Sequence, residues 1–152
     1  MSASLQKAIR NQQQKRDQGF TLIELLVVIV IVGILAAIAI PIFLNQRKKG
    51  VDAGIESDLK SLATAQETVY TDDLAYTTDA AKLEEAGFTL TGDNVIQAAI
   101  SGDGYCLRGS NADGSKDGGD GGYFWYDSLA GGLDSTQPAG ACAGTLTWVT
   151  VS

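Results

Sequence analysis

Histidine does not occur in this sequence, and cysteine occurs only twice. Without histidine the chain cannot form a histidine-based catalytic triad, a histidine-ligated metal site or an imidazole acid–base pair. The cysteines, Cys106 and Cys142, are too far apart for a C-x-x-C motif, and neither a G-x-S-x-G motif nor a phosphate-binding loop occurs. These absences predict a protein that is not an enzyme.

Basic residues are also few, and they are concentrated near the N-terminus. Residues 1–19 contain four basic residues and one acidic residue, net +3, whereas residues 20–152 contain seven basic and seventeen acidic residues, net −10. Together these give the formal net charge of −7. Proteins bind nucleic acids mainly through Lys and Arg side chains that neutralise phosphates, so the acidic body argues against direct nucleic-acid binding.

Charge is absent altogether from Leu25 to Leu44, and the twenty residues of this run are almost all apolar. A helix of about 20 apolar residues crosses the ~30 Å hydrocarbon core of a membrane. Fifteen of the residues are Leu, Ile, Val or Phe, and at roughly −0.3 to −0.6 kcal/mol each they favour insertion by several kcal/mol. Basic segments beside a membrane helix tend to stay in the cytoplasm, so we expect the rest of the chain to lie outside.

Hydropathy leaves two other interpretations open. An ordinary secretory signal would be cleaved after the small-residue pattern Ala37-Ile38-Ala39 and would release residues 40–152. The apolar run, however, is longer than the usual signal core of about 7–15 residues, and it continues past Ala39 with Pro41 close behind. The other interpretation is an uncleaved signal anchor that holds an unrelated domain.

One acidic residue, Glu24, stands at the edge of the apolar run. Carboxylates are costly in a membrane and usually mark a functional site there, although a glutamate at headgroup depth would be ordinary. Here Glu24 belongs to the sequence GFTLIELLVV at residues 19–28, which is followed by Gly33 and by an Ala-Ile-Pro sequence that ends at Pro41. This region, roughly residues 15–50, closely resembles the class III signal of type IV pilins and pseudopilins.

The resemblance implies that a membrane-embedded prepilin peptidase removes residues 1–19 as a leader. The peptidase would cut between Gly19 and Phe20 and methylate the new amine of Phe20. Before the cut this nitrogen is a neutral amide, and afterwards it is an amine that is mostly cationic near neutral pH. Cleavage would therefore create a cationic partner for Glu24 of a neighbouring subunit. Because an unpaired carboxylate in low dielectric costs several kcal/mol, this pairing would favour assembly.

By the same resemblance, we expect a structural subunit that polymerises with copies of itself into an extracellular type IV pilus. Its other partners would be the pilus assembly platform and its ATPase, and the cytoplasmic membrane would hold the precursor, with its N-terminus inside, before assembly. Gly33 and Pro41 weaken helical hydrogen bonding, and filamentous pilins commonly have a loosened helix in this region. Both residues are also tolerated in ordinary membrane helices.

The residues after the apolar run predict an α+β fold of the type IV pilin kind. Apolar residues three or four apart extend the N-terminal helix over residues 20–70, of which about 22–44 would span the membrane. An αβ-loop is expected at 71–92, with a short helix from Asp79 to Ala86. A head at 93–152 would pack a small antiparallel sheet against the helix. Its β-favouring runs are Val95–Ile100, Tyr105–Leu107, Gly122–Tyr126 and Thr145–Val151.

Both cysteines fall in this head. Because export would place the head in an oxidising compartment and no other cysteine competes, we expect a disulfide between Cys106 and Cys142. Closing this loop would contribute roughly 3–4 kcal/mol in the chain-entropy model. Two reduced thiols are expected only where the surroundings of the head are reducing.

The acidic segment before the third run has some features of a calcium-binding loop. Residues 111–120 present alternating oxygen-bearing side chains, which include Asp113, Asp117 and Asp120. Major pseudopilins of type II secretion resemble this in having an acidic calcium-binding region. The twelfth position counted from Asp113 is Phe124, however, where a full EF-hand loop has glutamate. We therefore expect a flexible acidic turn and no cofactor. The alternative is a calcium site, in which these three aspartates would be the ligands.

Four consecutive aromatic residues occupy positions 123–126. Alternate side chains of a strand point to opposite faces, so two of the four would enter the core and two would point outward. An outward pair would serve packing between subunits or cell adhesion, although such residues more often cover the helix.

Two other functions share parts of this pattern. A pseudopilin of a type II secretion or DNA-uptake system would carry the same signal but would not form abundant long surface filaments. A secreted or membrane-anchored binding module, for calcium or sugar, would not assemble, and its mature form would begin at a residue other than Phe20.

Overall fold

The computed structural model describes residues 19–119 and 122–151. The chain divides into two compact units, residues 1–42 and residues 43–152, and the long helix α2 (Leu22–Asp73) contributes to both. We call residues 1–42 the N-terminal unit and residues 43–152 the folded unit. Of the predicted leader, only Gly19 lies among the described residues.

The N-terminal unit contains the apolar part of α2. Every Leu, Ile, Val and Phe side chain from Leu22 to Ile42 is exposed. Within the described residues, α2 is the one helix that is long and apolar enough to cross a membrane. The helix continues through Gly33 and Pro41, so their loosening in a filament stays a prediction. A helix that is apolar all round, and whose large apolar side chains are not buried by the described residues, has the composition of a membrane span.

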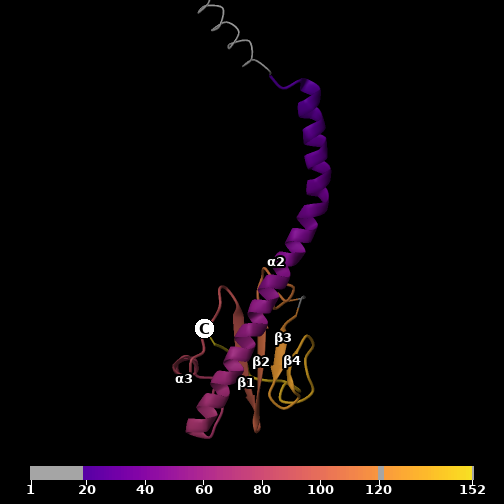
Figure 1. The fold of residues 1–152 in the computed structure, drawn as a ribbon. Helices are drawn as coiled ribbons and strands as arrows, with labels where there is room; N and C mark the ends of the chain where they lie inside the picture. The colour runs from indigo at the N-terminus through magenta and orange to yellow at the C-terminus, as the bar shows by residue number, and fades with distance from the viewer. Residues whose placement is uncertain (1–18, 120–121, 152) are drawn as a thin grey trace, which may run out of the picture. The chain divides into compact units, whose positions relative to one another are not determined.

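The folded unit begins where α2 becomes amphipathic. Ile55, Leu59 and Leu62 follow one another at spacings of four and three, which places them on one side of the helix. All three are fully buried, and they form a hydrophobic core with strand residues that include Ile96 and Leu107. In Figure 1 this part of α2 runs along one face of the sheet.

The sheet is antiparallel throughout, with strand order β4-β3-β2-β1-β5. The first four strands are neighbours in sequence, and the chain then crosses over to add β5 beside β1. A short helix, α3 (Ala80–Glu85), precedes the sheet and is capped by Asp79, whose carboxylate accepts a hydrogen bond from Ala81 N at 3.0 Å. The strands are β1 (Val95–Ser101), β2 (Gly104–Ser110), β3 (Phe124–Asp127), β4 (Gly132–Asp134) and β5 (Val149–Thr150).

These elements confirm the predicted α+β fold of a long helix and a small antiparallel sheet. The prediction for residues 145–151 is wrong in extent, because only Val149–Thr150 pairs with β1. Leu146 and Trp148 instead pack beside the disulfide. The short strand β4 (Gly132–Asp134) is absent from the sequence prediction, because three residues that include a glycine give no alternating pattern.

The four consecutive aromatic residues alternate between the two faces of the sheet, as predicted. Phe124 and Tyr126 pack against the core that contains α2. Tyr123 and Trp125 pack on the other face, around the disulfide. This second pair is not an open surface, because Trp125 is only 8% exposed and its ring centroid lies 5.7 Å from that of Trp148. The chain's own C-terminal segment covers it.

Candidate functional site

The junction between Gly19 and Phe20 lies immediately before α2. No side chain or distant backbone of the described chain comes within 4 Å of the space beside Gly19, and Phe20 is 88% exposed. The described residues therefore leave this peptide bond uncovered.

Thr21 and Glu24 cap the start of α2 together. One carboxylate oxygen of Glu24, Oε2, accepts hydrogen bonds from the backbone N of Thr21 at 2.9 Å and from Thr21 Oγ1 at 2.7 Å. The backbone N of Glu24 in turn donates to Thr21 Oγ1 at 3.3 Å. These reciprocal bonds form a capping box, which satisfies N–H groups that have no partner within a helix. The Thr-x-x-Glu spacing is a signal that our sequence reasoning missed.

This geometry leaves the Glu24 carboxylate with room for a further donor. A carboxylate offers about four acceptor positions, and the capping box uses two, both on Oε2. In the described part of the chain, no Lys or Arg side chain forms an ion pair with Glu24. Phe20 directly precedes Thr21, so an amine created at Phe20 would lie four residues before Glu24 in the sequence.

The predicted calcium candidates make other contacts. Asp113 forms an exposed ion pair with Arg47 at 2.7 Å, and Asp117 Oδ1 accepts a hydrogen bond from Gly119 N at 2.9 Å. Asp120 lies outside the described residues. Within residues 19–119 and 122–151, no group of three or more acidic, Cys or His side chains is placed to hold a metal ion.

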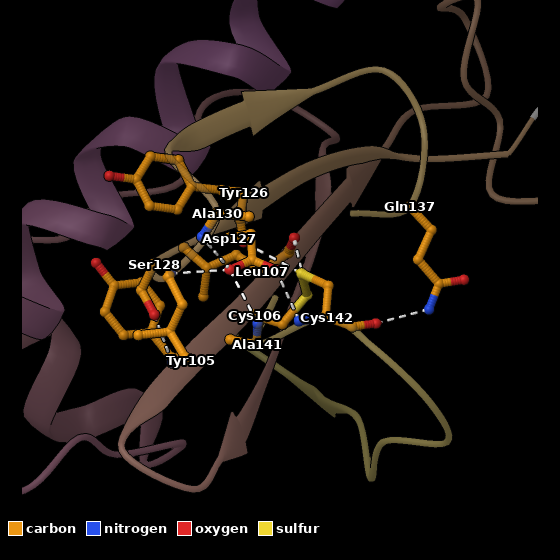
Figure 2. Close-up of a disulfide and its surroundings, with 11 residues drawn as sticks. Tyr105, Cys106, Leu107, Tyr126, Asp127, Ser128, Ala130, Gln137, Ala141 and Cys142 are labelled. Carbon is orange, nitrogen blue, oxygen red and sulfur yellow. Dashed lines mark hydrogen bonds between the residues drawn. A yellow bond between two sulfur atoms is a disulfide. The ribbon is translucent and has the colours of Figure 1, made fainter. Parts of the chain in front are cut away.

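The disulfide is the second site that the sequence predicts. The structure joins Cys106 on β2 to Cys142, with Cα atoms 4.9 Å apart, and both residues are fully buried. Figure 2 shows the bond beside Asp127 and a turn that carries Ala141. Gln137 Nε2 donates a hydrogen bond to the carbonyl of Cys142 at 2.8 Å.

Asp127, at the end of β3, is a buried residue that sequence reasoning missed. Its Oδ1 accepts hydrogen bonds from the backbone N of Leu129, Ala130 and Ala141, each at 2.9 Å, and its Oδ2 accepts one from Cys142 N at 2.8 Å. Burial disfavours the charged form, but these four donors outweigh it and hold the pKa of Asp127 below its usual value. The bonds from Leu129 and Ala130 belong to a local turn, but those from Ala141 and Cys142 join residues distant in the sequence, which no short-range signal reveals.

Arg108 fills the outer face of the sheet between aromatic rings. Its guanidinium carbon lies 4.2 Å from the ring centroid of Tyr123 and 4.1 Å from that of Trp148. Its Nε donates to Gln97 Oε1 at 2.7 Å. Burial lowers the pKa of Arg108. The side chain fastens Trp148, and with it the C-terminal segment, to the sheet.

Comparisons with known proteins identify the family. A family model of the prokaryotic N-terminal methylation motif matches residues 14–40. The chain is 37% identical over 103 residues to the type IV wide pilus major component PilA4 of Thermus thermophilus, an alignment that covers 66% of this chain and 79% of that protein. The chain belongs to the type IV pilin family. The 103 aligned residues outnumber the residues from the start of the chain to the end of α2 at Asp73. This likeness therefore includes residues of the folded unit beyond α2.

Two other relatives match over shorter regions. The type IV major pilin protein PilA of Myxococcus xanthus is 46% identical over 57 residues, 38% of this chain and 26% of that protein. The type II secretion system core protein G of Pseudomonas aeruginosa is 38% identical over 64 residues, 42% of this chain and 45% of that protein. The chain thus spans most of the Thermus protein and less than half of the other two.

Proposed function

We propose that this chain is the precursor of a type IV pilus subunit, which is cut between Gly19 and Phe20, methylated on Phe20 and polymerised with copies of itself. Its role is structural rather than catalytic. The observation that carries the proposal is the methylation motif at residues 14–40, which overlaps a helix whose large apolar side chains are all exposed there. A surface of this kind needs lipid or other apolar helices around it.

Assembly requires a specific interaction in addition to apolar contact. Lipid tails are as apolar as Leu and Ile side chains, so the hydrophobic effect gives little reason for one membrane helix to leave lipid for another. A charged pair between Glu24 of one subunit and the Phe20 amine of the next supplies that reason. Hydrogen bonds between charged groups are roughly twice as strong as neutral ones, and each subunit would carry both partners.

The capping box supports this role for Glu24. It fixes the carboxylate at the first turn of α2, with Oε2 bound to Thr21. The remaining acceptor positions are open to the amine of a neighbour, so capping and pairing can coexist. The precursor therefore keeps the carboxylate hydrogen-bonded until processing creates its partner.

The apolar part of α2 also supports a membrane stage before assembly. We propose that the precursor sits in the cytoplasmic membrane with the leader, residues 1–19, in the cytoplasm and the folded unit outside. Its partners at this stage are the prepilin peptidase, the assembly platform and the ATPase that drives assembly. The folded unit then becomes the surface of an extracellular filament.

A second candidate is a pseudopilin of type II secretion, which the likeness to core protein G favours. That likeness covers 64 residues, fewer than the leader and α2 together contain, whereas the 103-residue likeness to the wide pilus component must extend beyond the end of α2 at Asp73. Long filaments formed at native expression levels, seen by electron microscopy, would distinguish the pilus subunit from the pseudopilin.

Processing is tested with the full-length chain expressed with and without a prepilin peptidase. We expect the peptidase to shorten the wild-type chain and to leave Gly19→Leu at full length, because a large side chain then occupies the position before the cut. Gly33→Leu is the matched control and should be shortened like the wild type. Equal shortening of Gly19→Leu and wild type would refute the assigned cleavage site.

A further inference from the structure

Asp127 links the two halves of the disulfide through the backbone. On one side, Asp127 is the direct partner of Cys106 in the antiparallel pairing of β2 and β3. On the other side, its carboxylate Oδ2 accepts the hydrogen bond from Cys142 N at 2.8 Å. The pairing of β2 with β3 thus fixes Asp127 beside Cys106, and the Asp127 carboxylate fixes the backbone of Cys142. Neither contact involves a sulfur atom.

The same carboxylate organises the loop that carries Cys142. Oδ1 binds the backbone N of Leu129 and Ala130 at the start of the loop and of Ala141 near its end. The loop passes so close that a Cβ atom at Gly140 would lie 2.6 Å from Oδ1. In Figure 2 dashed lines run from Asp127 to Ala130, at one end of this loop, and to Ala141 and Cys142, at the other end beside the disulfide.

We propose that Asp127 is a positioning residue for disulfide formation: its carboxylate anchors both ends of residues 128–142, a segment that includes β4, and holds Cys142 against Cys106 before the bond exists. The inference concerns how the folded unit matures and does not depend on filament assembly. The buried Asp127 carboxylate needs the four backbone donors as hydrogen-bond partners. Because one of these donors is the backbone N of Cys142, forming the hydrogen bonds places Cys142 beside Cys106.

The chemical step is ordinary thiol–disulfide exchange with a small donor disulfide. The thiolate of one cysteine attacks the donor, forming a mixed disulfide and releasing one donor thiol. The thiolate of the other cysteine then attacks the mixed disulfide and releases the second donor thiol. The protein dithiol loses two electrons and two protons, and the donor disulfide gains them. Asp127 transfers neither and acts only by raising the effective concentration of one sulfur at the other.

Asp127→Asn tests this role against a matched substitution, Asp58→Asn. Asp58 is also a buried carboxylate, 2% exposed, but it accepts its hydrogen bonds from Thr91 N and Asn94 Nδ2, away from the disulfide. Full-length chains in detergent micelles are equilibrated with reduced and oxidised glutathione, and the fraction of bridged protein gives the effective thiol concentration.

We expect Asp127→Asn to lower this effective concentration at least tenfold, equivalent to about 30 mV, and Asp58→Asn to change it less than twofold. The proposal is overturned when Asp127→Asn matches the wild type, or when both variants lower the value equally, since a general loss of stability would then explain the effect.

A second measurement does not require the bridge. In the full-length double variant Cys106→Ala with Cys142→Ala, the backbone amides of residues 141 and 142 should remain protected from hydrogen exchange, because Asp127 still binds them. Adding Asp127→Asn should speed their exchange at least tenfold. Unprotected exchange in the double variant would show that the bridge holds the loop, which would overturn the proposal.

Discussion

At the scale of single residues, one substitution separates the capping of α2 by Glu24 from its proposed pairing with a neighbour's amine. Gln at this position can still cap Thr21, since capping boxes accept Gln as well as Glu, but it carries no charge. We expect Glu24→Gln to insert and to be processed normally. Filament yield should fall about tenfold or more, because a hydrogen bond to a charged group contributes ~1.5–3 kcal/mol. Electron microscopy and sheared-filament yield measure this.

Thr21→Ala is the control for the capping role. It removes the hydroxyl that bonds Glu24 and costs ~1 kcal/mol of helix stability, but it keeps the carboxylate and should still assemble. Normal filament yield from Glu24→Gln would show that the charge of Glu24 does not guide assembly.

Asp127 predicts an acid-dependent loss of stability. A carboxyl group whose pKa is lower in the folded than in the unfolded chain stabilises the fold above the unfolded value of ~3.9, and this contribution is lost as the pH falls through the folded pKa. The pKa of Asp127 is lowered in this way. The melting temperature of the oxidised wild type should therefore fall more steeply below about pH 4 than that of Asp127→Asn.

Asp134→Asn is the control for this titration. Its carboxylate is exposed, and hydrogen bonds from Thr136 lower its pKa. This variant should keep most of the wild-type acid sensitivity, because water competes for those bonds. Parallel pH profiles of wild type and Asp127→Asn would exclude Asp127 as the source.

At the scale of elements, the packing of α2 on β2 depends on a close approach at Gly109. A Cβ atom there would lie 2.5 Å from Ile55 Cγ2 and 2.8 Å from Ile96 Cδ1, and both isoleucines are fully buried. Gly109→Ala should therefore destabilise the folded unit by about 1–3 kcal/mol through overpacking. Urea unfolding followed by circular dichroism measures this.

Gly119→Ala provides the matched change, because the nearest atom to a Cβ at Gly119 is 3.6 Å away. It should alter stability by less than about 0.5 kcal/mol. Equal stability of Gly109→Ala and wild type would mean that the helix can shift away from the sheet without loss.

The sequence predicts these elements to different degrees. The second half of α2 carries a strong periodic pattern, β1 is a continuous β-favouring run, and Asp79 and Gly87 bracket α3, so local rules suffice there. The C-terminal segment is different, because Trp148 contacts Arg108 and Trp125 instead of extending a strand. Asp127 likewise acts through long-range backbone contacts, which periodicity does not reveal.

At the scale of the whole molecule, the two units differ in how their apolar side chains are covered. Every residue of the main hydrophobic core lies in the folded unit, which supplies its own packing. In the described part of the N-terminal unit, the Leu, Ile and Val side chains from Leu22 to Ile42 are all exposed, and we expect other molecules to cover them. The sequence signals this division through the change from a continuous apolar run to an amphipathic pattern near residue 45. We expect the motif around Gly19, Phe20 and Glu24 to determine that other subunits cover the apolar helix.

We propose that processing at Gly19 creates the charged Phe20 amine that assembly requires. Mass spectrometry of the subunit in purified surface filaments tests it directly. We predict a mature chain that begins at Phe20 and carries one methyl group on its terminal amine. A subunit that begins at Ile40, or one that retains the leader from Met1, would contradict the account.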